Sequence, residues 1–541
     1  MKSLRRSMKS LRRSTQFYLP GLFVIGALVA FSINLNNYFL SDDFAQIGKV
    51  LGGDFSVTWG HEYGGFFRPL FIWSYVIDGR LWGAHPFGYH LTNAVLHGAN
   101  SFLVFRLGRA LFSDGEAGIG NRLSLAAAVL FLFHPSHTEA VSWISGRADL
   151  IATSFVLVSL WSYLAYEKHR RTLLLIVSLL SFWLALLAKE SAICLPFIML
   201  VLSFRNATPG KTRTVLLKSF ASFAGVLVAF IALRAYFIGA VVGGYGASQH
   251  LNFSPRWIRD RLLEASTRSV LPTLPASWSL FLFKPLQSPL FYLIVLVSLG
   301  LITIAIVVRR KWYGPSKRKT QNRLLLTLLV SFLVSLLPVI SLRLNLYETL
   351  GERFLYLPTV FSVLLLAHLS VIWIRDRRVW LLILICVAGF YSINLYRTTR
   401  VWREASQLVF ALKNDLAASA SNDRVLILNA PDNLRGVPLF HNGLPEALQF
   451  FQKEKSIKQA DIVSFQSLHA ANDPIELNSA GDQLTLRASE AVDRFDRIKG
   501  TDCLDATSVQ SNSLRLQWKP CSAPTDVFFF SSGKMNRFTR N

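Results

Sequence analysis

The feature that most constrains this chain is a long series of apolar runs, many of them about twenty residues long, separated by short polar loops. A helix needs about twenty apolar residues to cross the hydrocarbon core of a bilayer. Only 16% of the 541 residues are charged, whereas soluble proteins carry about a quarter. The pattern predicts an α-helical polytopic membrane protein with about eleven transmembrane helices. They are expected near residues 17–36, 87–108, 123–141, 148–166, 172–188, 191–204, 215–237, 288–308, 322–340, 355–374 and 379–396.

The formal net charge of +25 raises the question of a nucleic-acid partner, which the placement of the basic residues answers. Lysines and arginines fall in short clusters between apolar runs, as at 168–171, 309–319 and 375–378. If the N-terminus is cytoplasmic, every strongly basic short loop lies on the same side, which is the positive-inside pattern. The sequence therefore predicts contact with membrane lipid and no nucleic-acid partner.

The basic segment 1–16 precedes the first apolar run. A secretory signal peptide also starts with basic residues, but no small-residue cleavage site follows this run, which is long enough to span. We expect an uncleaved first helix and a transmembrane domain over 17–397. Within it, prolines interrupt the apolar stretch in 256–285, where an interfacial or re-entrant element is expected.

An odd number of crossings places the tail, residues 398–541, outside the cytoplasm. Short apolar runs and one helical stretch predict a small extracytoplasmic α/β domain there. The expected strands are 424–430, 461–468, 483–488, 514–518 and 526–530, and the expected helix is 445–454. Cys503 and Cys521 are the only cysteines of the tail, and an oxidising compartment allows them to pair.

The densest polar clusters fall on the outer side, and the first lies in loop 40–86. Asp42 and Asp43 follow the first apolar run directly, and Arg68 lies further along the loop. Adjacent carboxylates can act as a general base with an orienting partner, or can bind a divalent cation. A Ser-Asp-Asp sequence can equally be a plain helix N-cap.

A second cluster contains His134, His137 and Glu139, followed by Arg147 and Asp149. The first three suggest metal ligands, but their spacing matches no zinc signature. The alternative is a set of satisfied polar side chains at a helix break.

Two further clusters complete the outer face. Lys189 and Glu190 form either a mutually neutralising pair or part of a site for a lipid phosphate. Glu352, Arg353 and Tyr356 precede a late helix, and the two charges can also be ordinary surface groups. Polar clusters on four loops at one membrane face are what an active site for a lipid-phosphate-linked substrate requires.

Several segments resemble the GT-C superfamily of polyprenyl-phosphate-sugar-dependent glycosyltransferases, above all the transmembrane and tetratricopeptide-repeat O-mannosyltransferases. The matching segments are SDDF at 41–44, FRPL at 67–70, HPSHTEAVSWISGRADL at 134–150, LLAKES at 186–191, GERFLYLP at 351–358 and the region of Trp402. The third segment is the most specific of them. The resemblance covers roughly residues 15–405, and the family's repeat domain is replaced by the tail.

The resemblance implies inverting transfer of a sugar, mannose or another hexose or pentose, from a polyprenyl-phosphate donor to a protein, lipid or glycan hydroxyl. Asp42 or Asp43 would be the base. Arg147, Lys189 and Arg353 would neutralise the donor phosphate. The remaining substrate-binding candidates are Arg68, His134, His137, Glu139, Asp149, Glu190, Glu352 and Tyr356. No cofactor would be obligatory, although Asp42 and Asp43 leave room for a divalent cation.

The compact architecture suggests a bacterial inner membrane and an undecaprenyl-type lipid. The main rival is a transporter or flippase of lipid-linked sugars, which would also present basic residues to a phosphate. Transporters commonly contain inverted repeats and interrupted helices at the midplane, and no convincing internal repeat is found here. A receptor with a glycan-binding outer domain is a third class, and it would not need the polar clusters to converge.

Overall fold

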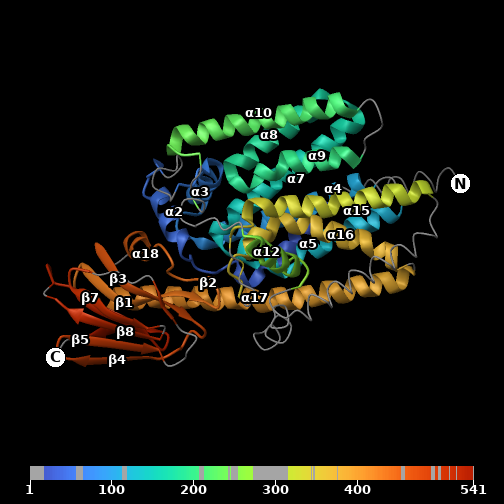
Figure 1. Ribbon diagram of the computed structural model, residues 1–541. Coiled ribbons are helices and arrows are strands. Elements are labelled where there is room, and N and C mark those ends of the chain that lie inside the picture. The colour runs from blue at the N-terminus through green and yellow to red at the C-terminus, as the bar shows by residue number, and fades with distance from the viewer. Residues whose placement is uncertain are drawn as a thin grey trace.

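The computed structural model describes most of the chain as a helical bundle and a β-rich C-terminal domain, joined by one long helix, α17 (Figure 1). Helix α17 runs from Arg377 to Ser419. The described residues are 18–56, 65–112, 118–205, 212–241, 244, 254–271, 315–342, 344, 348–374, 376–451, 457–488, 494–496, 501–510, 512–519 and 521–539.

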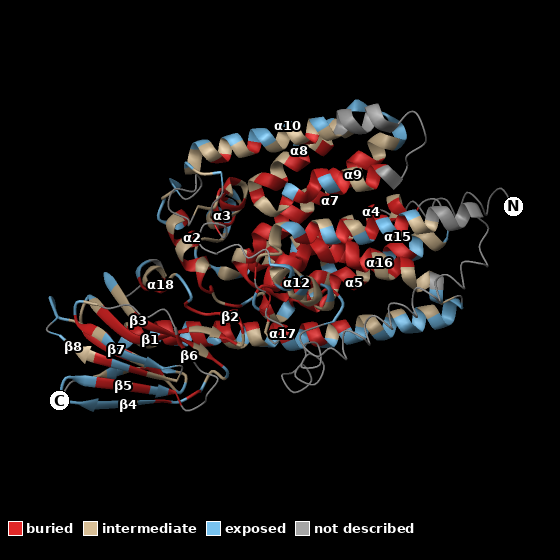
Figure 2. Ribbon diagram, in the orientation of Figure 1, coloured by how far each residue is buried: buried red, intermediate tan, exposed pale blue. Residues whose placement is uncertain are grey.

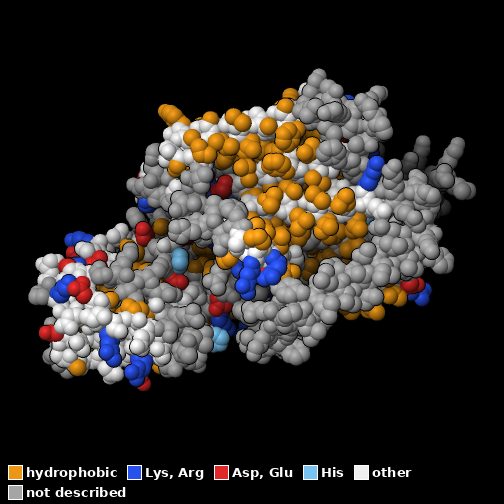
Figure 3. All heavy atoms as spheres, viewed as in Figure 1, with side chains coloured by type: hydrophobic (Ala, Val, Ile, Leu, Met, Phe, Trp, Pro, Cys, Tyr) orange, Lys and Arg blue, Asp and Glu red, His pale blue; other side chains and the backbone are white. Residues whose placement is uncertain are grey.

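The bundle confirms the prediction of a helical membrane protein. Five described helical segments are long and apolar enough to cross a membrane: Ile144–His169, Phe220–Ile238, Gln321–Val339, Glu352–Val371 and Arg377–Ser419. Four shorter apolar helices are Tyr18–Ala30, Ile119–Leu132, Thr172–Ala188 and Glu190–Ser203. Hydrophobic side chains cover a broad face of the bundle, as expected of a surface that meets lipid (Figure 3). The helix expected at 288–308 lies outside the described residues, so the count of eleven stays a prediction.

The bundle helices have the following bounds: α4 Pro86–Leu111, α5 Ile119–Leu132, α7 Arg147–His169, α8 Thr172–Ala188, α9 Leu195–Arg205, α10 Thr212–Ile238, α12 Pro255–Arg268, α15 Pro315–Leu336 and α16 Tyr356–Trp373. Short 3-10 turns lie between them: η1 Ser32–Asn34, η5 Glu190–Cys194, η7 Leu337–Val339 and η8 Glu352–Leu355. Helix α12 occupies the first half of the segment expected to be interfacial or re-entrant. Residues 272–285 of that segment lie outside the described part of the chain.

Loop 40–86 contains two helices that the sequence did not predict. Helix α2 spans Asp42–Leu51 and helix α3 spans Pro69–Trp82. Pro69 occupies the first turn of α3, where a missing N–H costs no intrahelical hydrogen bond. Both helices lie at the end of the bundle that faces the C-terminal domain (Figure 1).

The helix predicted over 123–141 is wrong beyond residue 132. Helix α5 ends at Leu132, and three short pieces follow: η3 Pro135–His137, α6 Thr138–Ser142 and η4 Ile144–Gly146. Pro135 cannot donate the backbone hydrogen bond that a continuing α-helix requires. The chain over 133–146 therefore folds as a compact, buried turn region between two long helices.

Buried polar side chains of α4 fix this turn region in place. Asn93 Nδ2 donates to the Trp143 carbonyl oxygen at 3.0 Å, and Asn100 Nδ2 donates to that of Leu150 at 3.0 Å. His97 Nε2 lies 3.0 Å from the Leu132 carbonyl oxygen. His97 thus satisfies a carbonyl group at the C-terminal end of α5, which has no intrahelical partner, whereas Asn93 adds a hydrogen bond to the turn region and Asn100 adds one to the start of α7.

The last predicted helix, 379–396, is too short. Helix α17 continues to Ser419, and its second half buries Trp402, Val409 and Leu416 against the C-terminal domain and loop 40–86. These residues recur at a helical period, so one continuous helix carries both a lipid-facing half and a half that packs against protein (Figure 2).

The C-terminal domain has two packed sheets, and all five predicted strands are present. One sheet has the order β10-β9-β1-β3-β6, with β2 beside β1, and the other has the antiparallel order β4-β5-β8-β7. The strands are β1 Arg424–Leu434, β2 Val437–Pro438, β3 Gln459–Leu468, β4 Ile475–Ala480, β5 Gln483–Ala488, β6 Arg494–Asp496, β7 Leu504–Gln510, β8 Ser513–Trp518, β9 Asp526–Ser531 and β10 Lys534–Phe538. The predicted helix is α18, Leu444–Phe450.

Strand β1 is apolar on both faces because it lies between two hydrophobic cores. Leu426 and Leu428 pack against the second sheet, whereas Val425 and Ile427 face the core shared with α2 and α17. This alternation follows from the two-residue repeat of a strand. The predicted pairing of Cys503 with Cys521 is confirmed as a disulfide.

Candidate active site

The carboxylate of Asp43 lies buried at the start of α2 and is held by three hydrogen bonds. Its Oδ1 accepts from the Ser145 backbone N–H at 2.9 Å and the Ser145 hydroxyl at 2.5 Å. Its Oδ2 accepts from the Leu40 N–H at 3.0 Å. Burial raises the pKa of Asp43 to about 7, an effect that Asp42 reinforces and the hydrogen bonds from Ser145 and Leu40 oppose. A fixed carboxyl group with this pKa suits a general base near neutral pH.

Asp42 points elsewhere, toward the C-terminal domain. Its Oδ1 accepts a hydrogen bond from Asn442 Nδ2 at 2.7 Å. Ser41 makes no side-chain cap on α2, so the plain N-cap interpretation of the Ser-Asp-Asp sequence is not the arrangement found. The two carboxylates therefore have different environments: Asp43 is buried, whereas Asp42 contacts the C-terminal domain.

Glu139 and Arg353 form a buried ion pair beside the turn region. Arg353 donates to Glu139 from both its guanidinium and its backbone N–H. Burial raises the pKa of Glu139, which Arg353 opposes. The Arg353 guanidinium also lies 4.8 Å from the centre of the Trp143 ring. The side chain of Arg353 is only 14% exposed, so it is not an ordinary surface charge.

Trp143 connects this ion pair to the Asp43 region. Its indole N–H donates to the Leu40 carbonyl oxygen at 3.2 Å, and the Leu40 N–H donates to Asp43. Trp143 thus contacts Leu40, which binds the candidate base Asp43, and it also contacts Arg353 of the η8 turn. The signal for this contact lies within the motif HPSHTEAVSWISGRADL, although the sequence gives no partner for Trp143 or Ser145.

Lys189 pairs with Asp149 and not with Glu190. Its Nζ lies 2.6 Å from Asp149 Oδ2 and 5.2 Å from the centre of the Phe354 ring. Arg353 lies 4.7 Å from the centre of the same ring. Two cations from distant parts of the sequence therefore flank one aromatic side chain.

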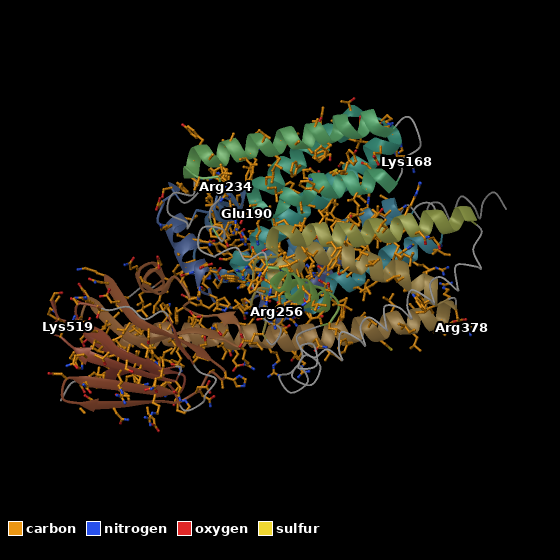
Figure 4. All side chains as sticks on the ribbon, in the orientation of Figure 1. Lys168, Glu190, Arg234, Arg256, Arg378 and Lys519 are labelled. Carbon is orange, nitrogen blue, oxygen red and sulfur yellow. A yellow bond between two sulfur atoms is a disulfide. The ribbon has the colours of Figure 1, made fainter. Side chains whose placement is uncertain are left out.

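Arg68 pairs with Glu190 at the same end of the bundle. The guanidinium donates to both carboxylate oxygens, with Nε to Oε2 at 2.9 Å. Arg234, a residue that the sequence did not single out, donates to the Gly65 carbonyl oxygen in the adjoining loop. Glu190 and Arg234 appear near each other at the end of the bundle that carries α2 and α3 (Figure 4).

Arg147 is fully buried, and protein groups surround its guanidinium. It forms an ion pair with Asp78 at 2.7 Å and donates to Asn93 Oδ1 at 2.7 Å and to the Tyr89 carbonyl oxygen at 2.8 Å. These contacts join α3, α4 and α7. The geometry favours a structural role for Arg147 over the predicted contact with a donor phosphate, which stays a prediction.

Glu352 forms a second deeply buried ion pair, with Arg268 at the end of α12. Both side chains are 1% exposed. The Arg268 carbonyl oxygen accepts from Ser136 Oγ at 2.8 Å. The Ser269 carbonyl oxygen lies 3.1 Å from His134 Nε2. The end of α12 is thereby anchored to the turn region.

The predicted histidines lie in the packed interior beneath this network. His137 Nε2 lies 2.7 Å from Thr359 Oγ1, and the His137 ring packs against Tyr356, whose hydroxyl lies 2.7 Å from His97 Nδ1. Burial lowers the pKa of His134 to about 4 and that of His137 well below its usual value. Both side chains are therefore neutral at pH 7. Within the described residues, no three His, Cys, Asp or Glu side chains are grouped as metal ligands.

The structure thus connects predicted residues of different loops at one end of the bundle through inter-loop contacts, and it buries Arg147 and the histidines in the packed interior. These features define a polytopic membrane protein with a polar, carboxylate-containing site at one end. No protein-family model matches the chain.

Over 20% to 31% of its length the chain is a distant homologue of protein O-mannosyl-transferases, as its motifs predicted, and the resemblance expected over the rest of residues 15–405 stays a prediction. It is 32% identical over 197 residues to TMTC4 of Mus musculus, covering 31% of this chain and 27% of that protein. It is 39% identical over 129 residues to Tmtc1 of Drosophila melanogaster, covering 24% and 14%. It is 41% identical over 106 residues to TMTC2 of Mus musculus, covering 20% and 12%. The chain therefore spans 12% to 27% of the length of these curated relatives.

Among solved structures, the chain aligns with the crystal structure of ArnT from Cupriavidus metallidurans bound to undecaprenyl phosphate. The alignment covers 92% of this chain and 97% of that one, with 12% sequence identity and a TM-score of 0.39.

Proposed function

We propose that the chain is a membrane glycosyltransferase that transfers a sugar from a polyprenyl-phosphate donor to an acceptor hydroxyl on the outer face of the membrane. The observation that carries the proposal is the contact path from Asp43 through Leu40 and Trp143 to Arg353. This path joins the buried carboxyl group of Asp43, whose pKa is about 7, to the guanidinium of Arg353. Arg353 and Lys189 both contact the ring of Phe354. Homology to O-mannosyl-transferases over part of the chain supports the same class of reaction.

In the proposed reaction the acceptor oxygen bonds to C1 of the sugar while the bond from C1 to the phosphate oxygen breaks. Asp43 accepts the proton of the acceptor hydroxyl, and the polyprenyl phosphate leaves with the bonding electron pair. A single displacement of this kind inverts the configuration at C1. Lys189 and Arg353 would stabilise the phosphate oxygens, since charge-assisted hydrogen bonds to phosphate are among the stronger polar contacts. The phosphate itself bears the leaving-group charge, so the mechanism does not require a cation at Asp42 and Asp43.

An apolar cavity of about 340 Å³ between α5, α16 and α17 suits the isoprenoid tail. Its walls include Leu130, Leu271 and Leu384. At one end the Tyr391 hydroxyl donates to the Val270 carbonyl oxygen at 2.5 Å, and the Tyr391 ring contacts His134. The cavity therefore lies next to the turn region.

The proposal is tested by supplying membranes that contain the purified protein with radiolabelled polyprenyl-phosphate-mannose and other polyprenyl-phosphate sugars. Appearance of label in a glycan, lipid or protein supports transfer and identifies the sugar. Movement of the labelled lipid across the bilayer without transfer would instead identify a transporter. Glycan profiling of a deletion strain would name the acceptor.

The rate of transfer should rise with pH and reach half of its maximum near pH 7. The base acts only when deprotonated, and burial raises the pKa of Asp43 to about 7. The value of kcat/KM measured from pH 5 to 9 checks this, because that ratio reports the pKa of the free enzyme. A profile that is flat from pH 5 to 8 would rule out Asp43 as the titrating base.

The proposed orientation in the membrane is supported by the charges at the two ends of the bundle. Lys168 and Arg378 lie at the end opposite Glu190, Arg234 and the C-terminal domain (Figure 4). A cytoplasmic position for the basic end places the candidate site and the C-terminal domain outside, in the periplasm if the membrane is a bacterial inner membrane.

A cysteine introduced at Asn478, on the exposed edge strand β4, should therefore react with a membrane-impermeant thiol reagent in intact cells. A cysteine at the exposed His169, at the end of α7, should stay unreacted until the cells are lysed. The unsubstituted chain controls for its own two free thiols. The opposite labelling pattern would invert the topology and remove the site from the outer face.

A further inference from the structure

The C-terminal domain contacts the first outer loop at the residues that precede the candidate base. The Ser41 N–H donates to the Leu439 carbonyl oxygen at 2.8 Å, and the Asn442 N–H donates to Ser41 Oγ at 3.2 Å. The Asn442 side chain donates to Asp42 at 2.7 Å. Segment 439–443, which connects β2 to α18, thus binds both backbone and side-chain groups of Ser41 and Asp42.

Ser41 has a backbone conformation that few non-glycine residues adopt. Its φ is 49° and its ψ is −117°, and such a conformation persists only where surrounding contacts impose it. The Ser41 N–H bonds to segment 439–443, the Ser41 carbonyl oxygen accepts from the Phe44 N–H at 3.1 Å, and α2 begins at the next residue. The conformation of Ser41 sets the direction in which α2, and therefore Asp43, leaves the loop.

The fit between the two segments is close. Gly443 has a φ of 84°, and a Cβ atom there would lie 2.5 Å from the Ser41 carbonyl oxygen and 3.0 Å from Phe44 Cβ. Phe44 also stacks on Phe440 with ring centres 6.2 Å apart. Both phenylalanine side chains are fully buried, so the contact excludes water and holds α2 against the C-terminal domain.

A second contact reaches the loop that leads to Glu352 and Arg353. Gly436, in the turn between β1 and β2, has a φ of 82°, and a Cβ atom there would lie 2.7 Å from Glu348 Cβ. The C-terminal domain therefore touches both polypeptide segments that supply the candidate base and one of the candidate phosphate-binding cations.

We propose that the C-terminal domain is a positioning element of the active site, and that Asn442 and Gly443 are positioning residues which hold Ser41 and Asp42 so that Asp43 faces the acceptor. This inference rests on the function proposed above. Neither residue contacts the reacting atoms in this scheme. They act through Ser41 and Asp42, so their loss should lower kcat and leave the KM for the donor unchanged.

The test uses the full-length protein with Asn442→Ala, Asn442→Asp and Gly443→Ala. Asn442→Ala should lower kcat by about 3- to 10-fold, the loss expected for one hydrogen bond. Asn442→Asp should lower it further, because a carboxylate beside Asp42 repels it. Gly443→Ala should lower kcat by about 10²-fold, since its Cβ displaces Ser41. A purely structural role predicts that the variants yield less folded protein while the folded enzyme keeps the wild-type kcat, and that result would overturn the proposal.

The matched control is Gly481→Ala in the β4–β5 turn. Gly481 also has a positive φ, 59°, but a Cβ there meets no atom within 4 Å. Its variant should suffer the same local backbone strain and keep wild-type kcat. Equal losses in Gly443→Ala and Gly481→Ala would contradict a specific role for segment 439–443.

Hydrogen exchange provides a readout that does not need activity. Backbone amides in 38–47 should exchange faster in Asn442→Ala and Gly443→Ala than in the wild type, while amides of β5 and β8 stay protected. Unchanged exchange in 38–47 would refute the coupling between the domains. If the wild type itself transfers no sugar, the proposed function fails, and the exchange experiment still decides whether the C-terminal domain positions this loop.

Discussion

Replacing Asp43 with asparagine should reduce sugar transfer by about 10² to 10⁴-fold, the scale of a general base, while the protein remains folded and inserted. The amide oxygen can still accept from Ser145, as Oδ1 of Asp43 does now at 2.9 Å from the backbone N–H. The side chain would keep its shape but could no longer accept a proton, and its amide nitrogen could not accept the hydrogen bond that Oδ2 now accepts from the Leu40 N–H. Transfer from labelled polyprenyl-phosphate sugar measures the effect, and elution as a single species from a size-exclusion column in detergent checks folding.

Two further aspartate-to-asparagine changes separate the base from general effects of charge removal. Asp54, just beyond α2, accepts from the Ser56 N–H in an exposed turn, so Asp54→Asn should leave transfer unchanged. Asp42→Asn should cause a smaller loss than Asp43→Asn, because Asp42 orients the loop through Asn442. Near wild-type transfer by both Asp42→Asn and Asp43→Asn would show that neither carboxylate is the base.

The sequence predicted the helices that face lipid because their signal is local. A span must be apolar over its own length whatever surrounds it. The same criterion failed at 397–419, where α17 continues. That half packs on protein through a stripe that includes Trp402 and Val409 and is polar elsewhere. The run of apolar residues ends where contact with lipid is expected to end, but the helix continues beyond that point.

The break at 133–146 was missed for a different reason. The prediction continued one helix across the polar segment 134–139 to the apolar Ala140 and Val141, and the hydrogen bonds that stabilise the turn region come from α4. Asn93 and His97 read in the sequence as isolated polar residues in an apolar helix. Only their distance from Trp143 and Leu132 in space reveals that they satisfy the backbone there.

The sequence predicted which loops contribute to the candidate site, but it did not predict which charged residues form ion pairs with each other. Lys189 and Glu190 are adjacent in sequence, yet each pairs with a residue from another loop, Asp149 and Arg68. Similarly, the partner of Glu352 is Arg268, a residue that no motif marked. Motifs identify the charged residues that are expected to be buried. Their ion-pair partners depend on how the helices pack in space.

Removing Glu352 alone should destabilise the protein by about 3 to 5 kcal/mol, because Arg268 would then be buried without this carboxylate. Both side chains are 1% exposed, so water cannot replace the lost partner. The end of α12 would lose its ion pair to η8, and the turn region would lose support from the carbonyl oxygens of Arg268 and Ser269. Thermal unfolding of Glu352→Ala in detergent should show a lower midpoint than the wild type.

The double variant Arg268→Met with Glu352→Leu should recover most of this loss, since two apolar side chains of similar volume can replace a buried ion pair at little cost in stability. Asp260→Ala, on the same helix, removes the carboxylate of a pair with Arg259 whose side chains are 47% and 39% exposed, and it should leave the midpoint unchanged because exposed pairs contribute little. The double variant should be folded yet inactive if Glu352 also shapes the substrate pocket, and folded and active if the pair only anchors α12. A double variant as unstable as Glu352→Ala would mean that the stability lost at this position comes from contacts other than the ion pair.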